Sequence, residues 1–151
     1  MTTGIIAKAQ VVPLLLEASP SARPAWEQHL ASWHGEQAGD VNDVAVFAHH
    51  IVDCYAEGAT AEYGELFATV ERILSEGDDE ARSLAAFGLL EDVQTIASHQ
   101  SFGPDAFVSW LGPKSREAWD QIATLWRSGG GSLAGVIRSE RRLQPRRSSR
   151  S

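Results

Sequence analysis

The sequence predicts an all-α fold, an antiparallel helical bundle or a short array of helical hairpins with about six to seven helices. Apolar residues recur close to every 3.6 residues through most of the chain, whereas the alternation typical of strands is nearly absent. Glycine and proline divide this pattern into short stretches. With 151 residues, 43% of them hydrophobic, the chain is long enough to bury one core. We therefore expect a single helical domain over residues 1–128, followed by a Gly-rich linker and a basic tail over residues 129–151.

The first two predicted helices cover residues 9–18 and 24–33. Pro13 lies either near the start of the first helix or at a kink within it. The segment Ser19-Pro20-Ser21 separates the two, and Pro24 suits the first turn of the second. Residues 35–40 are expected to form a loop.

The next two predicted helices have the clearest apolar stripes. The third runs through Val44 and Tyr55 and ends at Gly58, a residue that favours helix C-termini. Thr60 is the expected N-cap of the fourth, which Gly77 closes. The short connection between them indicates that they pack side by side.

The fifth predicted helix, from Asp78 to about Ala97, is apolar on more than one face, which is typical of a central helix. Gly88 in its middle lowers helix propensity by roughly 1 kcal/mol relative to alanine. This cost is understandable if a neighbouring helix packs against the bare backbone there. Two shorter helices are expected after Gly103-Pro104 and Gly112-Pro113, and one weak turn over residues 133–137.

The charge of the chain is unevenly distributed. Residues 138–151 hold six arginines against Glu140, a balance of +5, so the net charge of −7 leaves −12 on the preceding residues. An acidic body repels nucleic acid and attracts basic partners. Contact with nucleic acid is therefore expected only through the arginine-rich tail. An equally simple role for the tail is loose pairing with the acidic body of its own chain.

Cysteine content and hydropathy indicate the compartment. The single cysteine, Cys54, excludes an intrachain disulfide, and its place in an apolar pattern predicts a buried, inert thiol. The first eight residues lack the pattern of a signal peptide. No apolar run is long enough to span a bilayer. We expect a cytoplasmic protein without membrane contact.

Two groups of polar residues are candidates for chemistry. His49, His50 and Asp53 lie within one helical turn and could donate two ligands to a metal, but the pattern of a metalloprotease helix is absent. Glu91 and Asp92 could act as a general acid and base. The structural interpretation is favoured in both cases. His50 and Asp53 would be a flank pair on a solvated face. Of the two carboxylates, one would point to solvent and the other would cap a neighbouring helix or pair with Arg82 or Lys114.

The five tryptophans have two interpretations. Trp119 and Trp126 share one helical stripe, and Trp26 and Trp33 are seven residues apart on another helix. Most are expected in the core, although tryptophan is also enriched at binding hot spots. Neither a phosphate-binding glycine loop nor a Gly-x-Ser-x-Gly motif is present, so no enzymatic activity and no cofactor is predicted.

Several segments resemble an uncharacterised bacterial family of small, acidic, all-helical domains of unknown function. The similarity lies in the helix start Gly77-Asp78-Asp79-Glu80-Ala81, in the segment from Phe87 to Gln94, and in the turn from Trp110 to Trp119. A leucine-rich first helix and Trp26-Glu27 are also similar, and the resemblance covers about residues 10–127. It implies a protein similar to immunity proteins of toxin systems, which bind partners and have no catalytic motif.

Together these observations predict a non-catalytic protein-interaction domain, in concrete terms an immunity-like inhibitor that binds a basic partner or toxin. The predicted contact surface is acidic and consists of Glu71, Glu76, Asp78, Asp79 and Glu80. The alternative is a helical module that binds a small molecule or metal. Its candidate pocket would be lined by His49, His50, Asp53, Glu91, Asp92, Trp119 and Trp126.

Overall fold

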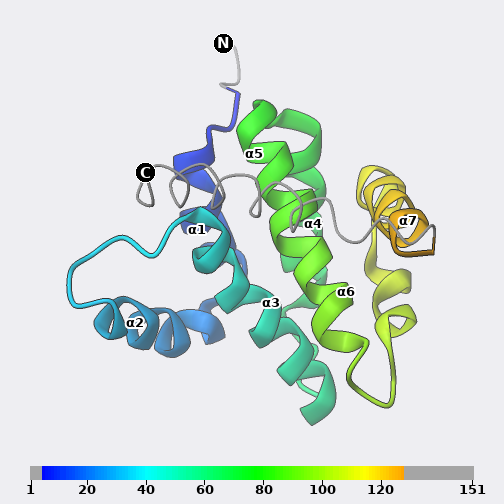
Figure 1. Ribbon diagram of the computed structural model, residues 1–151, viewed down its shortest axis with the longest axis horizontal. Coiled ribbons are helices and arrows are strands. Elements are labelled where there is room, and N and C mark those ends of the chain that lie inside the picture. Colours follow the sequence, from blue (N-terminus) through cyan, green and yellow to red (C-terminus); the bar gives the residue numbers. More distant parts are fainter. Residues whose placement is uncertain (1–4, 128–151) are drawn as a thin grey trace, which may run out of the picture.

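The computed structural model describes residues 5–127, which form helices and short connections (Figure 1). The α-helices are α1 (Val11–Ala18), α2 (Arg23–Ser32), α3 (Asp40–Glu57), α4 (Tyr63–Glu76), α5 (Asp79–Ser83), α6 (Glu91–Ala97) and α7 (Pro113–Arg127). Short 3₁₀ helices cover Lys8–Gln10, Pro20–Ala22 and Pro104–Trp110. The predicted all-α class is confirmed. The predicted linker and tail (residues 129–151) and the turn at 133–137 lie outside the described residues.

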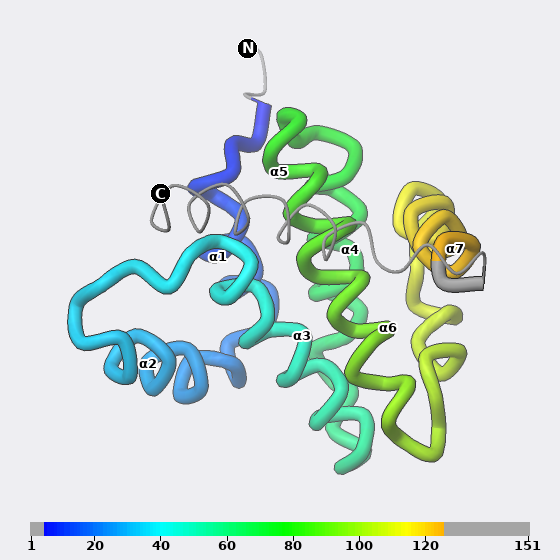
Figure 2. Tube along the Cα trace, viewed as in Figure 1, coloured from blue at the N-terminus to red at the C-terminus, as the bar shows by residue number. Residues whose placement is uncertain are grey.

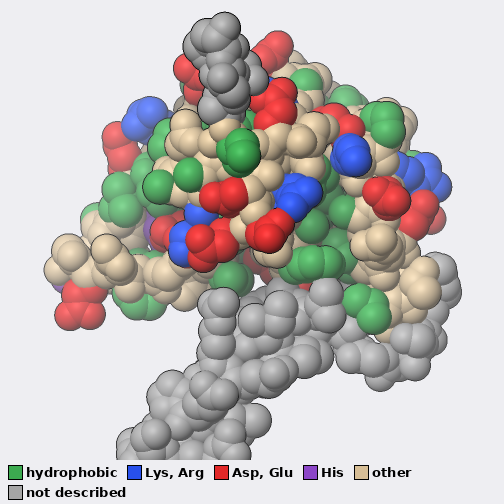
Figure 3. Space-filling view, turned by 90° about the horizontal axis from the view of Figure 1, so that it is seen from above, with side chains coloured by type: hydrophobic (Ala, Val, Ile, Leu, Met, Phe, Trp, Pro, Cys, Tyr) green, Lys and Arg blue, Asp and Glu red, His purple; other side chains and the backbone are tan. Residues whose placement is uncertain are grey.

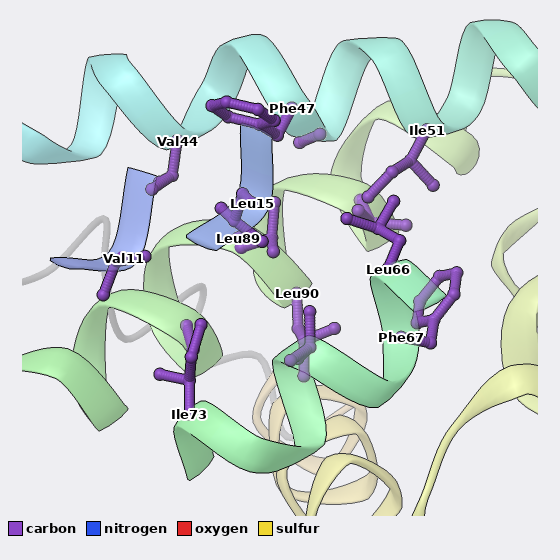
Figure 4. Close-up of a cluster of buried hydrophobic side chains, with 14 of the residues drawn as sticks. Val11, Leu15, Val44, Phe47, Ile51, Leu66, Phe67, Ile73, Leu89 and Leu90 are labelled. Carbon is purple, nitrogen blue, oxygen red and sulfur yellow. The ribbon is translucent and has the colours of Figure 1, made fainter. Parts of the chain in front are cut away.

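The core forms where α3 packs along the continuous helix that contains α5 and α6. From α3, Val44, Phe47 and Ile51 point toward leucines of the other helices, as Figure 4 shows. The short helix α1 packs against α4 and contributes Leu15, which is fully buried. On the other side of α4, α7 closes the core with Ile122. The predicted apolar stripes are therefore the buried faces.

The predicted fifth helix contains a π-helical segment, Leu84–Leu90, between α5 and α6. Every residue of this segment except Phe87 is buried. A Cβ atom at Gly88 would lie 3.0 Å from Cγ2 of Val44 on α3. The close approach expected at Gly88 is therefore present. The π-helical geometry itself was not predicted, because hydrophobic periodicity does not distinguish a single wide turn from an ordinary one.

The start of α4 differs from the sequence prediction. Thr60 is not the N-cap, since the helix begins at Tyr63 and follows Glu62. A turn intervenes, in which the Thr60 carbonyl accepts a hydrogen bond from the Tyr63 amide at 3.1 Å. Threonine is a good N-cap in isolation, but here Glu62 occupies the cap position, and its carboxylate accepts hydroxyl hydrogen bonds from Ser19 and Ser21 in the α1–α2 connection.

Two backbone hydrogen bonds attach the start of the described chain to the corner between α4 and α5. The amide of Ile6 donates to the Glu76 carbonyl at 2.9 Å, and the amide of Asp78 donates to the Ile6 carbonyl at 2.8 Å. The pair forms an isolated parallel bridge between Ile6 and Gly77. The Asp78 carboxylate also accepts the Ala81 amide at 2.8 Å, which confirms it as the N-cap of the following helix.

An aromatic cluster joins the C-terminal end of α3 and the N-terminal end of α4 to the segment that precedes α7. Tyr55 lies 4.7 Å from Phe102 and 5.2 Å from Phe107 between ring centroids, and Tyr63 lies 4.9 Å from Trp110. The buried Tyr63 hydroxyl donates to the Ile51 carbonyl, and burial raises the pKa of this phenol above its usual value. Within residues 5–127, no helix is both long enough and apolar enough to cross a membrane.

Candidate functional site

Helix α2 is the element least integrated into the core. None of its ten residues is buried. Leu30 is 51% exposed, Trp33 just after the helix is 38% exposed, and Trp26 is half-buried. In Figures 1 and 2, α2 lies at the edge of the domain and is joined to α3 by an open connection. We call Trp26, Leu30 and Trp33 the α2 platform. Such large apolar side chains on an outer helix are typical of a binding surface.

Two side-chain contacts hold α2 against α3, and a ring contact within α2 accompanies them. The Trp26 ring lies 5.9 Å from the Phe47 ring on α3, between centroids. His29 Nε2 is 2.9 Å from the Asp43 carboxylate, also on α3. The Trp26 and His29 rings are 5.4 Å apart. One ring contact and one side-chain hydrogen bond to α3 thus position a helix with little buried surface of its own.

Two pockets flank Trp26. The first, of about 440 Å³, lies between α1 and α2, with an apolar floor that includes Val12, Leu16 and Trp26. Its rim carries Lys8, Arg23, Asp40 and Asp43. The second, of about 420 Å³, lies between α2 and the start of α3, and we call it the α2–α3 pocket. Its lining contains both platform tryptophans, Leu30, His29 and three carboxylates: Glu36, Asp40 and Asp43.

A lysine connects this region to the predicted acidic surface. Lys8 Nζ lies 3.0 Å from the Asp40 carboxylate and 3.6 Å from the Glu80 carboxylate. The hydrogen bond with Asp40, reinforced by both negative charges, raises the pKa of Lys8. Glu80, on α5, is therefore close to Asp40 at the rim of both pockets, although 72 positions separate Lys8 from Glu80 in sequence.

The predicted acidic surface is divided between structural and exposed groups. Asp78 caps α5, as described above, and Glu71 accepts hydrogen bonds at 2.9 Å from the amides of Lys114 and Ser115 and from the Ser115 hydroxyl. Glu76 is 3.3 Å from Arg72. The most exposed carboxylates are those of Asp79, which pairs with Arg82, and Glu80, at 92% and 72%. On the face seen in Figure 3, side chains of both charges lie beside hydrophobic ones.

The hydrogen bonds of Glu71 change its acidity. Partial burial works to raise the pKa of this carboxyl, but the amide and hydroxyl donors at the start of α7 outweigh burial and lower the pKa below its usual value. Glu71 thus stabilises the α7 N-terminus. The partner-binding role of Glu71 stays a prediction from the sequence.

The residues of the candidate pocket predicted from the sequence differ widely in burial. His49 and Asp53 are exposed, whereas Glu91 is buried, with 1% of its surface accessible, and Asp92 is half-buried. Trp119 is 3% exposed and belongs to the core, and the Trp126 side chain lies outside the described part of the chain. None of these residues lines either pocket beside α2. Within residues 5–127, no group of three His, Cys, Asp or Glu side chains could hold a metal.

His50 belongs instead to a polar cluster at the α1–α2 connection. Its Nε2 atom is 2.8 Å from the Ser21 hydroxyl and 3.4 Å from the Cys54 sulfur. Ser21 and Ser19 each donate a hydroxyl hydrogen bond of 2.6 Å to Glu62. Partial burial works to raise the pKa of Glu62, but these donors outweigh it and lower that pKa. The predicted pairing of His50 with Asp53 is thus replaced by contacts with Ser21 and Cys54.

This cluster does not activate the cysteine. Partial burial, together with the carboxylates of Glu57, Glu62 and Asp53, raises the pKa of the Cys54 thiol. A raised pKa reduces the thiolate fraction at neutral pH, whereas a nucleophilic cysteine needs the opposite. Cys54 is half-buried rather than fully buried as predicted. The four-residue spacing of His50 and Cys54 was the sequence signal for their contact.

Fold and site together define a small all-α domain with an exposed aromatic platform. The family described as "Domain of unknown function (DUF7674)" matches residues 12–127, and the chain belongs to that family. This finding confirms the resemblance to a helical domain of unknown function. No curated protein and no solved structure matches the chain.

The α2 platform was not assigned as a site from the sequence. Its signal was the combination of Trp26, Leu30 and Trp33 on one short helix whose remaining residues are mostly polar. The core interpretation of Trp33 is wrong, since the side chain is 38% exposed. A helix with so few apolar positions has too narrow an apolar face to be buried in the core. Its large apolar side chains are then available to bind another molecule.

Proposed function

We propose that this domain is a non-catalytic protein-interaction module whose α2 platform binds a basic partner. The observation that carries the proposal is the exposure of Leu30 and Trp33 beside the carboxylates of Asp40 and Asp43. Aromatic side chains supply most of the binding energy at typical hot spots, and surrounding charges select the partner and speed association.

An immunity-like inhibitor of a toxin is the concrete role that agrees with this arrangement and with the excess of acidic residues. Glu80, which Lys8 connects to the pocket rim, extends the proposed surface toward Asp79. A protein with a single half-buried cysteine is compatible with a cytoplasmic setting. Asp79 and Glu80 are the most exposed carboxylates of the predicted acidic surface, and neither caps a helix.

Affinity capture with the full chain tests this function. Wild type should retain one basic protein in a one-to-one ratio at moderate salt. The double variant Leu30→Ala/Trp33→Ala should lose it, because hot-spot truncation costs about 2 kcal/mol or more per residue. The charge reversal Asp79→Lys/Glu80→Lys should weaken capture and reduce its salt dependence.

The matched control is Ile5→Ala. Ile5 is another large apolar side chain, 69% exposed, and it lies outside both pockets. This variant should capture the partner as wild type does. Equal capture by the platform variant and wild type would remove α2 from the interface.

The pocket between α1 and α2 favours a second candidate function, the binding of a small zwitterionic molecule. Its apolar floor is flanked by two cations, Lys8 and Arg23, and by two carboxylates, Asp40 and Asp43. A thermal-shift screen of amino acids and dipeptides tests it, since a ligand at 100 times its Kd stabilises a protein by about 2.7 kcal/mol. An absence of shifts across the library at millimolar concentration would reject this candidate.

A further inference from the structure

The α2–α3 pocket has the chemistry of an arginine site. Its three carboxylates, Glu36, Asp40 and Asp43, are accompanied by the indole rings of Trp26 and Trp33, and its lining contains neither lysine nor arginine. A guanidinium group stacks on tryptophan and binds carboxylates through two parallel hydrogen bonds. A lysine ammonium cannot combine these two contacts in the same way.

The carboxylates retain the capacity to accept such a group. Asp43 contacts His29 at 2.9 Å through Oδ1, and Asp40 contacts Lys8 at 3.0 Å through Oδ2. Each carboxylate has about four lone-pair sites, so one neighbour does not saturate it. The side chains of Asp43 and Asp40 are 26% and 49% exposed, and Glu36 is exposed. An incoming arginine can therefore reach them without displacing either existing contact.

The chain itself carries a segment of matching composition. Residues 138–151 include the pairs Arg141-Arg142 and Arg146-Arg147 and only one acidic residue. The pocket and this segment have opposite charges, and the segment is rich in the one cation that suits an indole-lined acidic pocket.

The length of chain after α7 is sufficient for an intramolecular contact. In Figure 1, α7 ends on the side of the domain opposite α2. Residues 128–137 can span about 33 Å before the first tail arginine, and the chain continues for a further 14 residues. A domain of this size has a radius of gyration of about 14 Å. The tail can therefore reach the pocket around the surface.

We propose that residues 138–151 bind the α2–α3 pocket of their own chain and compete there with the basic partner. The inference rests on the proposed function, since it assigns a regulator to the same surface. Tethering gives the tail an effective concentration of about 1 mM, so even a weak contact is occupied for most of the time. The partner binds by displacing the tail.

A labelled synthetic peptide of residues 138–151 is the probe. It is titrated by fluorescence anisotropy into the full wild-type chain and into the full-length variant Arg141→Gln/Arg142→Gln/Arg146→Gln/Arg147→Gln. With an intrinsic Kd of about 100 μM and the effective concentration above, the wild-type chain should bind the peptide about tenfold more weakly than the variant. Equal Kd values of the peptide for the two chains would show that the tail does not occupy the pocket of its own chain.

Further titrations use the tail-neutralised chain. Trp33→Ala and Glu36→Gln should each weaken peptide binding by about fivefold or more, whereas Ile5→Ala should leave the Kd unchanged. A peptide with lysine in place of every arginine should also bind at least fivefold more weakly. Unchanged binding in both pocket variants would exclude this pocket, and equal binding of the lysine peptide would reduce the contact to nonspecific charge attraction.

These outcomes separate the two proposals. If partner capture depends on Leu30 and Trp33 but the peptide binds wild type and the tail-neutralised chain equally, only the autoinhibitory contact fails. If the peptide titrations behave as expected but the platform variant captures the partner as wild type does, the proposed function fails and the tail contact stands.

Discussion

Glu71 illustrates how one carboxylate can be required by the fold although it lies on a polar face. It accepts two amides and one hydroxyl at the start of α7. The variant Glu71→Gln should destabilise the protein by about 1–2 kcal/mol, because it weakens charge-assisted capping of exposed N–H groups. Chemical denaturation followed by circular dichroism measures this loss.

Glu65→Gln is the control for this prediction, because Glu65 is an exposed glutamate on the same helix. It should change the free energy of unfolding by less than about 0.5 kcal/mol. Gly112→Ala offers an independent check, since a Cβ there would lie 2.6 Å from Oε1 of Glu71 and would displace the cap. Its destabilisation should not add to that of Glu71→Gln in the double variant. Full additivity would show that the two residues act separately.

At the scale of elements, two helical glycines should respond oppositely to the same substitution. A Cβ at Gly64 of α4 meets nothing within 4 Å, so Gly64→Ala should stabilise the protein by about 0.5–1 kcal/mol through helix propensity. A Cβ at Gly88 would lie 3.0 Å from Val44 and 3.1 Å from Leu84. Gly88→Ala should therefore destabilise by about 1 kcal/mol, because overpacking exceeds the propensity gain. Thermal unfolding of both variants measures whether each substitution raises or lowers the stability of the protein.

Helix α2 should open more readily than the helices around it. Its side chains are not buried, whereas α4 buries six, so less free energy opposes its local detachment. Hydrogen exchange followed by mass spectrometry should show faster exchange for peptides from residues 23–32 than for peptides from residues 63–76. His29→Ala should accelerate exchange in α2 alone, because it removes the contact with Asp43. Uniform exchange across the domain would contradict this account.

Most of the elements could be predicted because local signals agreed with the final fold. The Gly-Pro steps before the last two helices, the Gly58 and Gly77 ends, and the stripes of α3 and α4 all indicated their helices correctly. The start of α4 could not be predicted, because the hydrogen-bonding partners of Glu62 are Ser19 and Ser21, 43 and 41 positions away in sequence. The π-helical segment could not be predicted, because hydrophobic periodicity does not distinguish one wide turn from an ordinary one. For the residues of the candidate pocket, helical spacing predicts which share a face but does not say which faces meet.

For the molecule as a whole, the ionisation of two carboxyl groups makes the free energy of unfolding depend on pH. The pKa values of Glu62 and Glu71 are lower in the folded protein than their usual value of 4.5. Their stabilisation is therefore complete above about pH 4.5 and is lost as the pH falls through the lowered values. Urea unfolding between pH 3 and pH 7 should show this decline in wild type. The double variant Glu62→Gln/Glu71→Gln should be less stable at neutral pH and should decline less steeply, and an unchanged slope would assign the effect to other groups.

The backbone bridge between Ile6 and Gly77 also constrains the order in which the chain acquires its structure. The segment before α1 leaves the ribosome before its partner at the end of α4, which is made some seventy residues later. During synthesis at roughly 5–20 residues per second, this segment waits for several seconds without its hydrogen-bonding partner. Docking of the beginning of the chain is therefore a late event, and it completes the corner where α5 starts.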